Sequence, residues 1–74
     1  MRNTTELELP RPSGGLGRAL AIIDYLAARS PEQVGVSIVA RELNLPKTVA
    51  HRILKELVAN GFLSFDETSK QYRL

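Results

Sequence analysis

Residues 46–61 have the sequence PKTVAHRILKELVANG, and this stretch decides how the rest of the chain folds. At about 100° per residue, one half of it is apolar and consists of Val49, Ala50, Ile53, Leu54, Leu57 and Val58. The other half consists of Lys47, Thr48, His51, Arg52, Lys55 and Glu56, with Ala59. Pro46 suits the first turn of a helix, where its missing N–H is not needed. Gly61 suits the left-handed position that follows a helix end. The sequence therefore predicts an amphipathic helix from Pro46 to about Asn60.

Two further helices are predicted upstream. The spacing of one helical face is found among Leu16, Ala19, Leu20, Ile23, Leu26 and Ala27. Ser30-Pro31 ends this first helix, because the residue before a proline avoids the helical region. Ser37 is the expected N-cap of a short second helix that ends near residues 44–45. Two helices that meet across a turn of about three or four residues are typical of a helix-turn-helix.

A β-hairpin is predicted downstream, with strands at 62–65 and 71–74 and a polar connection at 66–70. Residues 34–36 are a candidate third strand. The side chains expected to cover the core from the hairpin are Leu63, Phe65, Tyr72 and Leu74. The expected fold is α+β and mainly α: a winged helix-turn-helix of three helices and a hairpin. Residues 1–15 have no apolar periodicity and are expected to form a flexible arm, which leaves 16–74 as the domain.

Composition excludes several classes of site. A chain of 74 residues suits one domain. It has no cysteine and one histidine, His51, so disulfides are excluded and neither a metal site nor a cofactor is expected. No apolar run approaches the roughly 18 residues that span a membrane, and the N-terminus lacks the pattern of a secretion signal. We therefore expect a cytoplasmic protein. The sequence pI of about 9.4 is a weak indication of a nucleic-acid partner.

The polar half of the 46–60 helix suits double-stranded DNA. The major groove, about 12 Å wide, admits one helix, and side chains near its N-terminal end read the base edges. Phosphates attract lysine, arginine, hydroxyl donors and the positive end of the helix dipole. The expected DNA contacts on this helix are Lys47, Thr48, His51, Arg52 and Lys55. Ser37, ahead of the second helix, and Lys70, at the hairpin tip, are further candidates.

Simpler interpretations stand beside this one. Solvent-facing helix halves are usually polar, and Arg52 can pair instead with Glu56 or Glu42. Lys70 and Arg73 either grip phosphates or are ordinary strand charges. The same holds in the arm for Arg2 and Arg11, which either touch phosphates or stay solvated.

Two other function classes remain open. A winged helix can serve as a protein–protein or dimerisation module, but the donor-rich outer face without a large apolar residue favours DNA. An enzyme would need a nucleophile, a base and an orienting group, and His51 has no such companions, so no catalytic residue is expected.

The sequence resembles one known family, the N-terminal DNA-binding domain of isocitrate lyase regulator (IclR) type bacterial repressors and activators. The resemblance covers Leu16 to Leu74 and rests on the segments 18–23 (RALAII), 45–54 (LPKTVAHRIL), 60–63 (NGFL) and 72–74 (YRL). The run Pro-Lys-Thr-x-x-His-Arg-x-Leu, followed by Gly-Phe, is more specific than a generic winged helix requires.

The resemblance implies a transcription regulator that acts as a homodimer or dimer of dimers on near-palindromic operators. The family motif places recognition contacts on Lys47, Thr48, His51 and Arg52, and the wing around Lys70 against the DNA backbone. Arg18 matches a family arginine that contacts phosphate or buttresses the fold. Family members also carry a linker helix and a larger effector domain after the wing. We therefore expect this chain to be the DNA-binding part of such a regulator, with any small-molecule effector acting only through a domain that is absent from it.

Overall fold

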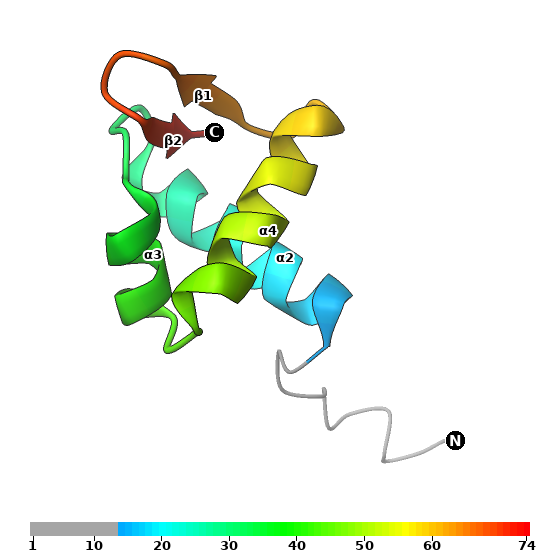
Figure 1. Cartoon of the computed structure of the whole chain (residues 1–74). Helices are drawn as coiled ribbons and strands as arrows, with labels where there is room; N and C mark the ends of the chain where they lie inside the picture. Colours follow the sequence, from blue (N-terminus) through cyan, green and yellow to red (C-terminus); the bar gives the residue numbers. More distant parts are fainter. Residues whose placement is uncertain (1–13) are drawn as a thin grey trace.

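The computed structural model describes residues 14–74, so the expected arm contacts of Arg2 and Arg11 lie outside it. Three helices are followed by an antiparallel hairpin (Figure 1), in the order α2 (Gly15–Arg29), α3 (Val36–Glu42), α4 (Lys47–Ala59), β1 (Ser64–Asp66) and β2 (Gln71–Arg73). The prediction of a mainly α winged helix-turn-helix with a hairpin is confirmed. No helix among residues 14–74 has the length and apolar character needed to cross a bilayer.

The second helix begins earlier than the sequence predicted. Its N-cap is Gly35, and Ser37 lies inside α3, so the prediction of Ser37 as N-cap is wrong. The reason is a long-range contact: Val34 exchanges two backbone hydrogen bonds with Tyr72, with N···O distances of 2.7 and 2.8 Å. This pairing fixes the chain as extended at Val34 and lets the helix start at Val36. The candidate strand at 34–36 is thereby reduced to a single bridged residue.

The ends of α4 agree with the prediction except that the helix begins one residue later, at Lys47. Pro46 is the N-cap, with extended backbone (ψ 140°), instead of the first helical residue. Residues 43–46 form the turn between α3 and α4. Gly61 follows the helix with φ +83°, a conformation that a residue with a Cβ rarely adopts.

The hairpin is shorter than predicted and its first strand is shifted. Phe65 pairs with Tyr72, and Asp66 belongs to β1 instead of the connection. The rings of Phe65 and Tyr72 are 4.8 Å apart between centroids. Leu63 and Tyr72 are buried as expected, whereas Leu74 is 41% exposed and does not cover the core.

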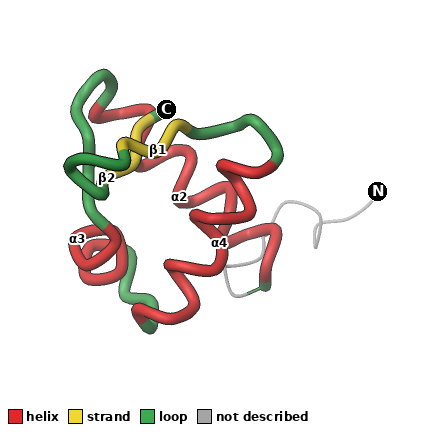
Figure 2. Tube along the Cα trace, turned by 45° about the horizontal axis from the view of Figure 1, so that its top comes forward, coloured by secondary structure: helices red, strands yellow, loops and turns green. Residues whose placement is uncertain are grey.

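The core lies between α2, α3, α4 and the hairpin, whose arrangement Figure 2 shows. It confirms the predicted apolar half of α4. Ala50, Ile53, Leu54 and Leu57 are fully or nearly buried there, and Val49 and Val58 are half-buried. Because α4 packs on both α2 and α3, its polar half is directed away from the core.

The predicted buried face of α2 is partly wrong. Ile22 and Leu26 are 0% exposed, whereas Leu16 and Leu20 are 75% and 56% exposed. Ala27 is also exposed. Apolar residues surround most of this helix, so its sequence allows several buried faces. Packing against α4 selects the one that contains Ile22.

A matched pair of substitutions tests this assignment. Leu26→Ala should lower the free energy of unfolding by about 2–5 kcal/mol, because it empties a fully buried site. Leu20→Ala, the same change on the exposed side of the helix, should cost less than about 1 kcal/mol. Denaturant unfolding followed by circular dichroism measures both. Equal losses would show that both side chains are buried in solution.

Candidate nucleic-acid interface

The outer half of α4 is exposed along its whole length. This surface comprises Lys47, Thr48, His51, Arg52, Lys55 and Glu56, all of which are exposed. Among residues 14–74 the side-chain ion pairs are Arg41–Glu42 (3.8 Å) and Lys70–Glu67 (4.0 Å). Arg52 therefore pairs with neither Glu42 nor Glu56, and the simpler interpretation of this arginine is not the arrangement that the structure adopts.

The start of α4 forms one side of an open hollow of about 360 Å³. Lys47, Thr48 and His51 line it from α4, and Val36 lines it from the first turn of α3. The N-cap Pro46 makes no side-chain hydrogen bond to the helix. The first backbone N–H groups of α4 therefore have no side-chain cap, and the positive end of the helix dipole lies at this end of the helix.

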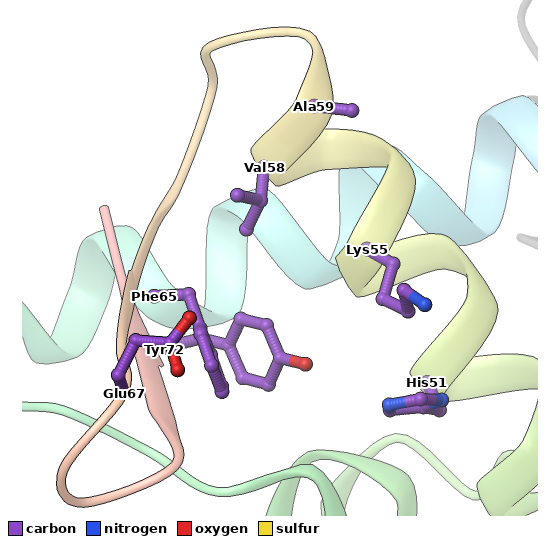
Figure 3. Close-up of a pocket in the computed structure, with 7 residues that line it drawn as sticks. All are labelled: His51, Lys55, Val58, Ala59, Phe65, Glu67 and Tyr72. Atoms are coloured by element: carbon purple, nitrogen blue, oxygen red, sulfur yellow. The ribbon is translucent and has the colours of Figure 1, made fainter.

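A second hollow of about 410 Å³ lies between α4 and the hairpin (Figure 3). His51 and Lys55 line it from the helix, opposite Phe65, Glu67 and Tyr72. Figure 3 shows the Tyr72 ring extending from β2 toward the side of α4 that carries His51 and Lys55. Burial raises the pKa of Tyr72 above its ordinary 10.0, so its hydroxyl stays protonated at neutral pH.

Arg52 lies on the opposite flank of α4. It lines a smaller hollow of about 180 Å³ together with Gly15 and Ala19 of α2 and with Phe62. The predicted contacts on α4 are thus distributed over two flanks, with His51 and Lys55 toward the hairpin and Arg52 toward α2. A single groove-filling helix presents both flanks to the two DNA strands that border a major groove.

The hairpin carries Lys70 at its tip, with φ +60° and an exposed side chain 4.0 Å from the Glu67 carboxylate. The loop around Lys70 is fixed by Asp66, whose Oδ1 accepts hydrogen bonds from the backbone N–H groups of Thr68 (2.8 Å) and Ser69 (3.3 Å). These bonds hold the wing tip in one conformation.

Gln33 ties the wing to the segment between α2 and α3. Its Nε2 donates to Asp66 Oδ2 (3.1 Å), and its Oε1 accepts from Ser69 Oγ (2.9 Å). The Gln33 hydrogen bond, together with those of Thr68 and Ser69, lowers the pKa of Asp66 below its ordinary 3.8. Sequence reasoning missed Gln33 and Asp66. The turn formed by Asp66 is a local signal, but no local pattern links it to a glutamine 33 residues away.

Two predicted DNA contacts lie on the other helices. Ser37 is exposed on α3, directly after Val36. Arg18 is half-buried on α2, and its Nε is buried without a hydrogen-bond partner among residues 14–74. The structure therefore does not bring Arg18 together with Lys47, Thr48 and His51. Within residues 14–74 no three histidine, cysteine or carboxylate side chains gather in a group that could hold a metal ion.

Comparisons with known proteins agree with this geometry. Residues 15–67 match the IclR helix-turn-helix domain. The chain is 39% identical over 59 residues to the glycerol operon regulatory protein of Streptomyces coelicolor, a match that covers 80% of this chain and 23% of that protein. The fold is similar to the crystal structure of an IclR transcriptional regulator from Alicyclobacillus acidocaldarius, with a TM-score of 0.76 and 27% identity, over 81% of this chain and 24% of that one.

The chain thus spans about a quarter of the length of each of these regulators. The family match covers α2, α3, α4 and β1, which are the elements that build and orient the exposed face. The expected resemblance is confirmed, and the protein–protein alternative is not favoured. The chain belongs to the IclR helix-turn-helix family.

Proposed function

We propose that this domain binds double-stranded DNA sequence-specifically, with α4 in the major groove and the hairpin as a wing against the neighbouring backbone. One observation carries the proposal: the apolar half of α4 is buried while every polar residue of its other half is exposed. Five exposed side chains on that half can donate hydrogen bonds, namely Lys47, Thr48, His51, Arg52 and Lys55. The one carboxylate on the same half of α4, Glu56, lies toward the end of the helix.

The roles follow from position along the helix. Lys47, Thr48 and His51 occupy the first turns, where side chains reach base edges. Lys55 and Arg52, on opposite flanks, suit the phosphates that border the groove. Lys70 at the wing tip suits a phosphate or the adjacent minor groove, and Ser37 suits a phosphate near α3. For Arg18 the half-buried side chain favours the buttressing role over direct contact.

The relatives extend the proposal to the assembly. One of them is named as an operon regulator, so we propose that this domain acts on an operator in bacterial DNA and works in the cytoplasm, where the chromosome lies. Two copies in a homodimer would present two α4 helices about 34 Å apart, which fits a near-palindromic site. We place the start of the domain at Gly15, where α2 and the family match begin, one residue earlier than the sequence predicted. We place the response to any small-molecule effector outside this domain, and we propose binding without catalysis.

Salt dependence is the most direct test of phosphate contact. The chain should retard a duplex selected from a random-sequence pool, and log affinity should fall against log salt with a slope of about −3 to −5 per protomer, at about 0.9 per phosphate contact. Electrophoretic retardation over a range of salt concentrations measures this slope. Absence of retardation at low salt, or a slope near zero, would contradict the proposal.

Replacement of Arg52 separates binding from folding. Arg52→Ala should weaken binding to all duplexes alike and reduce the salt slope by about 1, as expected for the loss of one phosphate contact. The free energy of unfolding should change by no more than about 0.5 kcal/mol, since the side chain is exposed and makes no ion pair among residues 14–74.

Arg29→Ala is the matched control, because it removes the same charge from the last turn of α2, where the guanidinium lies over the Tyr25 ring, 4.1 Å from its centroid, instead of on the exposed half of α4. Arg29→Ala should leave duplex affinity nearly unchanged. Normal binding with early melting in Arg52→Ala would instead make Arg52 a structural residue.

A further inference from the structure

We propose that the hollow at the start of α4 receives the 5-methyl group of a thymine, and that Val36 is a specificity-determining residue. The inference rests on the proposed binding of α4 in the major groove. It adds a residue of α3 to the reading surface and assigns a base to it.

The hollow is built from two helices. Val36, the first residue of α3, faces Lys47, Thr48 and His51 of α4 across the open space of about 360 Å³. Val36 is half-buried, so part of its apolar side chain stays accessible to whatever enters the hollow. A helix-turn-helix brings the first turns of its second helix to the base edges of the major groove. Val36 shares its hollow with the residues of those turns, so we infer that it lies within reach of the same bases.

The four residues that line the hollow indicate which group of a DNA duplex can occupy it. None of the four lining residues is acidic, whereas the hollow on the hairpin side contains Glu67. Negative DNA can therefore approach the start of α4 more closely. Val36 offers no hydrogen bond to a phosphate and would remove part of its hydration, so the Val36 side of the hollow suits an apolar group better than the backbone.

Thymine supplies the matching group. It is the one standard base that presents a methyl group in the major groove, and proteins read that methyl by apolar contact, including contact with threonine. Lys47, at the edge of the same hollow, can donate to an acceptor on a neighbouring base, such as O6 or N7 of guanine. The recognised half-site should thus contain a thymine beside a base that Lys47 reads.

Uracil substitution tests the methyl contact alone. Each thymine of a duplex selected by the wild-type chain is replaced in turn by uracil, which keeps the pairing and O4 and removes only the methyl group. Affinity should fall about fourfold at one position in each half-site, the value for burial of one methyl-sized group. It should stay nearly constant at the others. Cytosine at that position should bind better when it carries a 5-methyl group.

Variants locate the contact. Val36→Ala should bind the thymine and uracil duplexes almost equally. Thr48→Ser, an exposed change that keeps the hydroxyl and removes a methyl, should also reduce the thymine preference without affecting folding. Ile38→Ala is the control on the same helix: Ile38 is 37% exposed and does not line the hollow, so the preference should persist.

The outcomes separate this inference from the proposal on which it rests. A chain that binds its selected duplex but tolerates uracil at every position overturns the thymine assignment and leaves DNA binding intact. A uracil effect that persists in both Val36→Ala and Thr48→Ser overturns the assignment to this hollow. A chain that binds no duplex at low salt overturns the proposed function and this inference together.

Discussion

Burial of one half of α4 is the constraint on which the rest of the structure depends. Ile53, Leu54 and Leu57 share a single core with Ile22 and Leu26 of α2. Each such side chain contributes about 1.5–3 kcal/mol when fully buried, whereas a surface ion pair on the same helix is worth a few tenths. Core burial therefore fixes the rotation of α4 about its axis. Once that rotation is fixed, every donor on the other half must face outward, with no separate interaction needed to expose it.

The wing depends on a different kind of interaction. Its strands are three residues each, and Tyr72 is buried in the core, but hydrogen bonds also fix where the hairpin lies. The two backbone bonds between Val34 and Tyr72 join it to the chain between α2 and α3, and the bonds from Gln33 fix its loop. The segment 33–36 thus holds the wing, starts α3 and supplies Val36 to the reading surface. A single short stretch sets the position of the hairpin relative to the start of α4.

The local sequence pattern was sufficient to predict which side of α4 is buried. It was insufficient to predict the buried side of α2 or the start of α3. The apolar and polar residues of α4 divide cleanly, so its buried and exposed sides could be predicted from residues 46–61 alone. The helix α2 is apolar on most sides, and only contact with α4 decides that Ile22 is buried and Leu20 is not. The start of α3 depends on the pairing of Val34 with Tyr72, which lie far apart in the sequence. Ser37 is a stronger local capping signal than Gly35, so the sequence alone misplaces the start of the helix.

The same division applies to the candidate site. Exposure of Lys47, Thr48 and His51 followed from the helical wheel. The hollow that these three residues share with Val36, and the separate hollows lined by Lys55 and Arg52, arise from the packing of α2, α3 and the hairpin around α4. These features depend on tertiary contacts that periodicity does not encode.

The most direct measurement is amide NMR of the isotope-labelled chain during titration with a duplex it has selected. We expect the largest shift changes at residues 47–55, smaller ones at 66–71, and little change along the buried side of α2. Large changes along α2, with residues 47–55 unmoved, would contradict the claim that the exposed half of α4 enters the DNA.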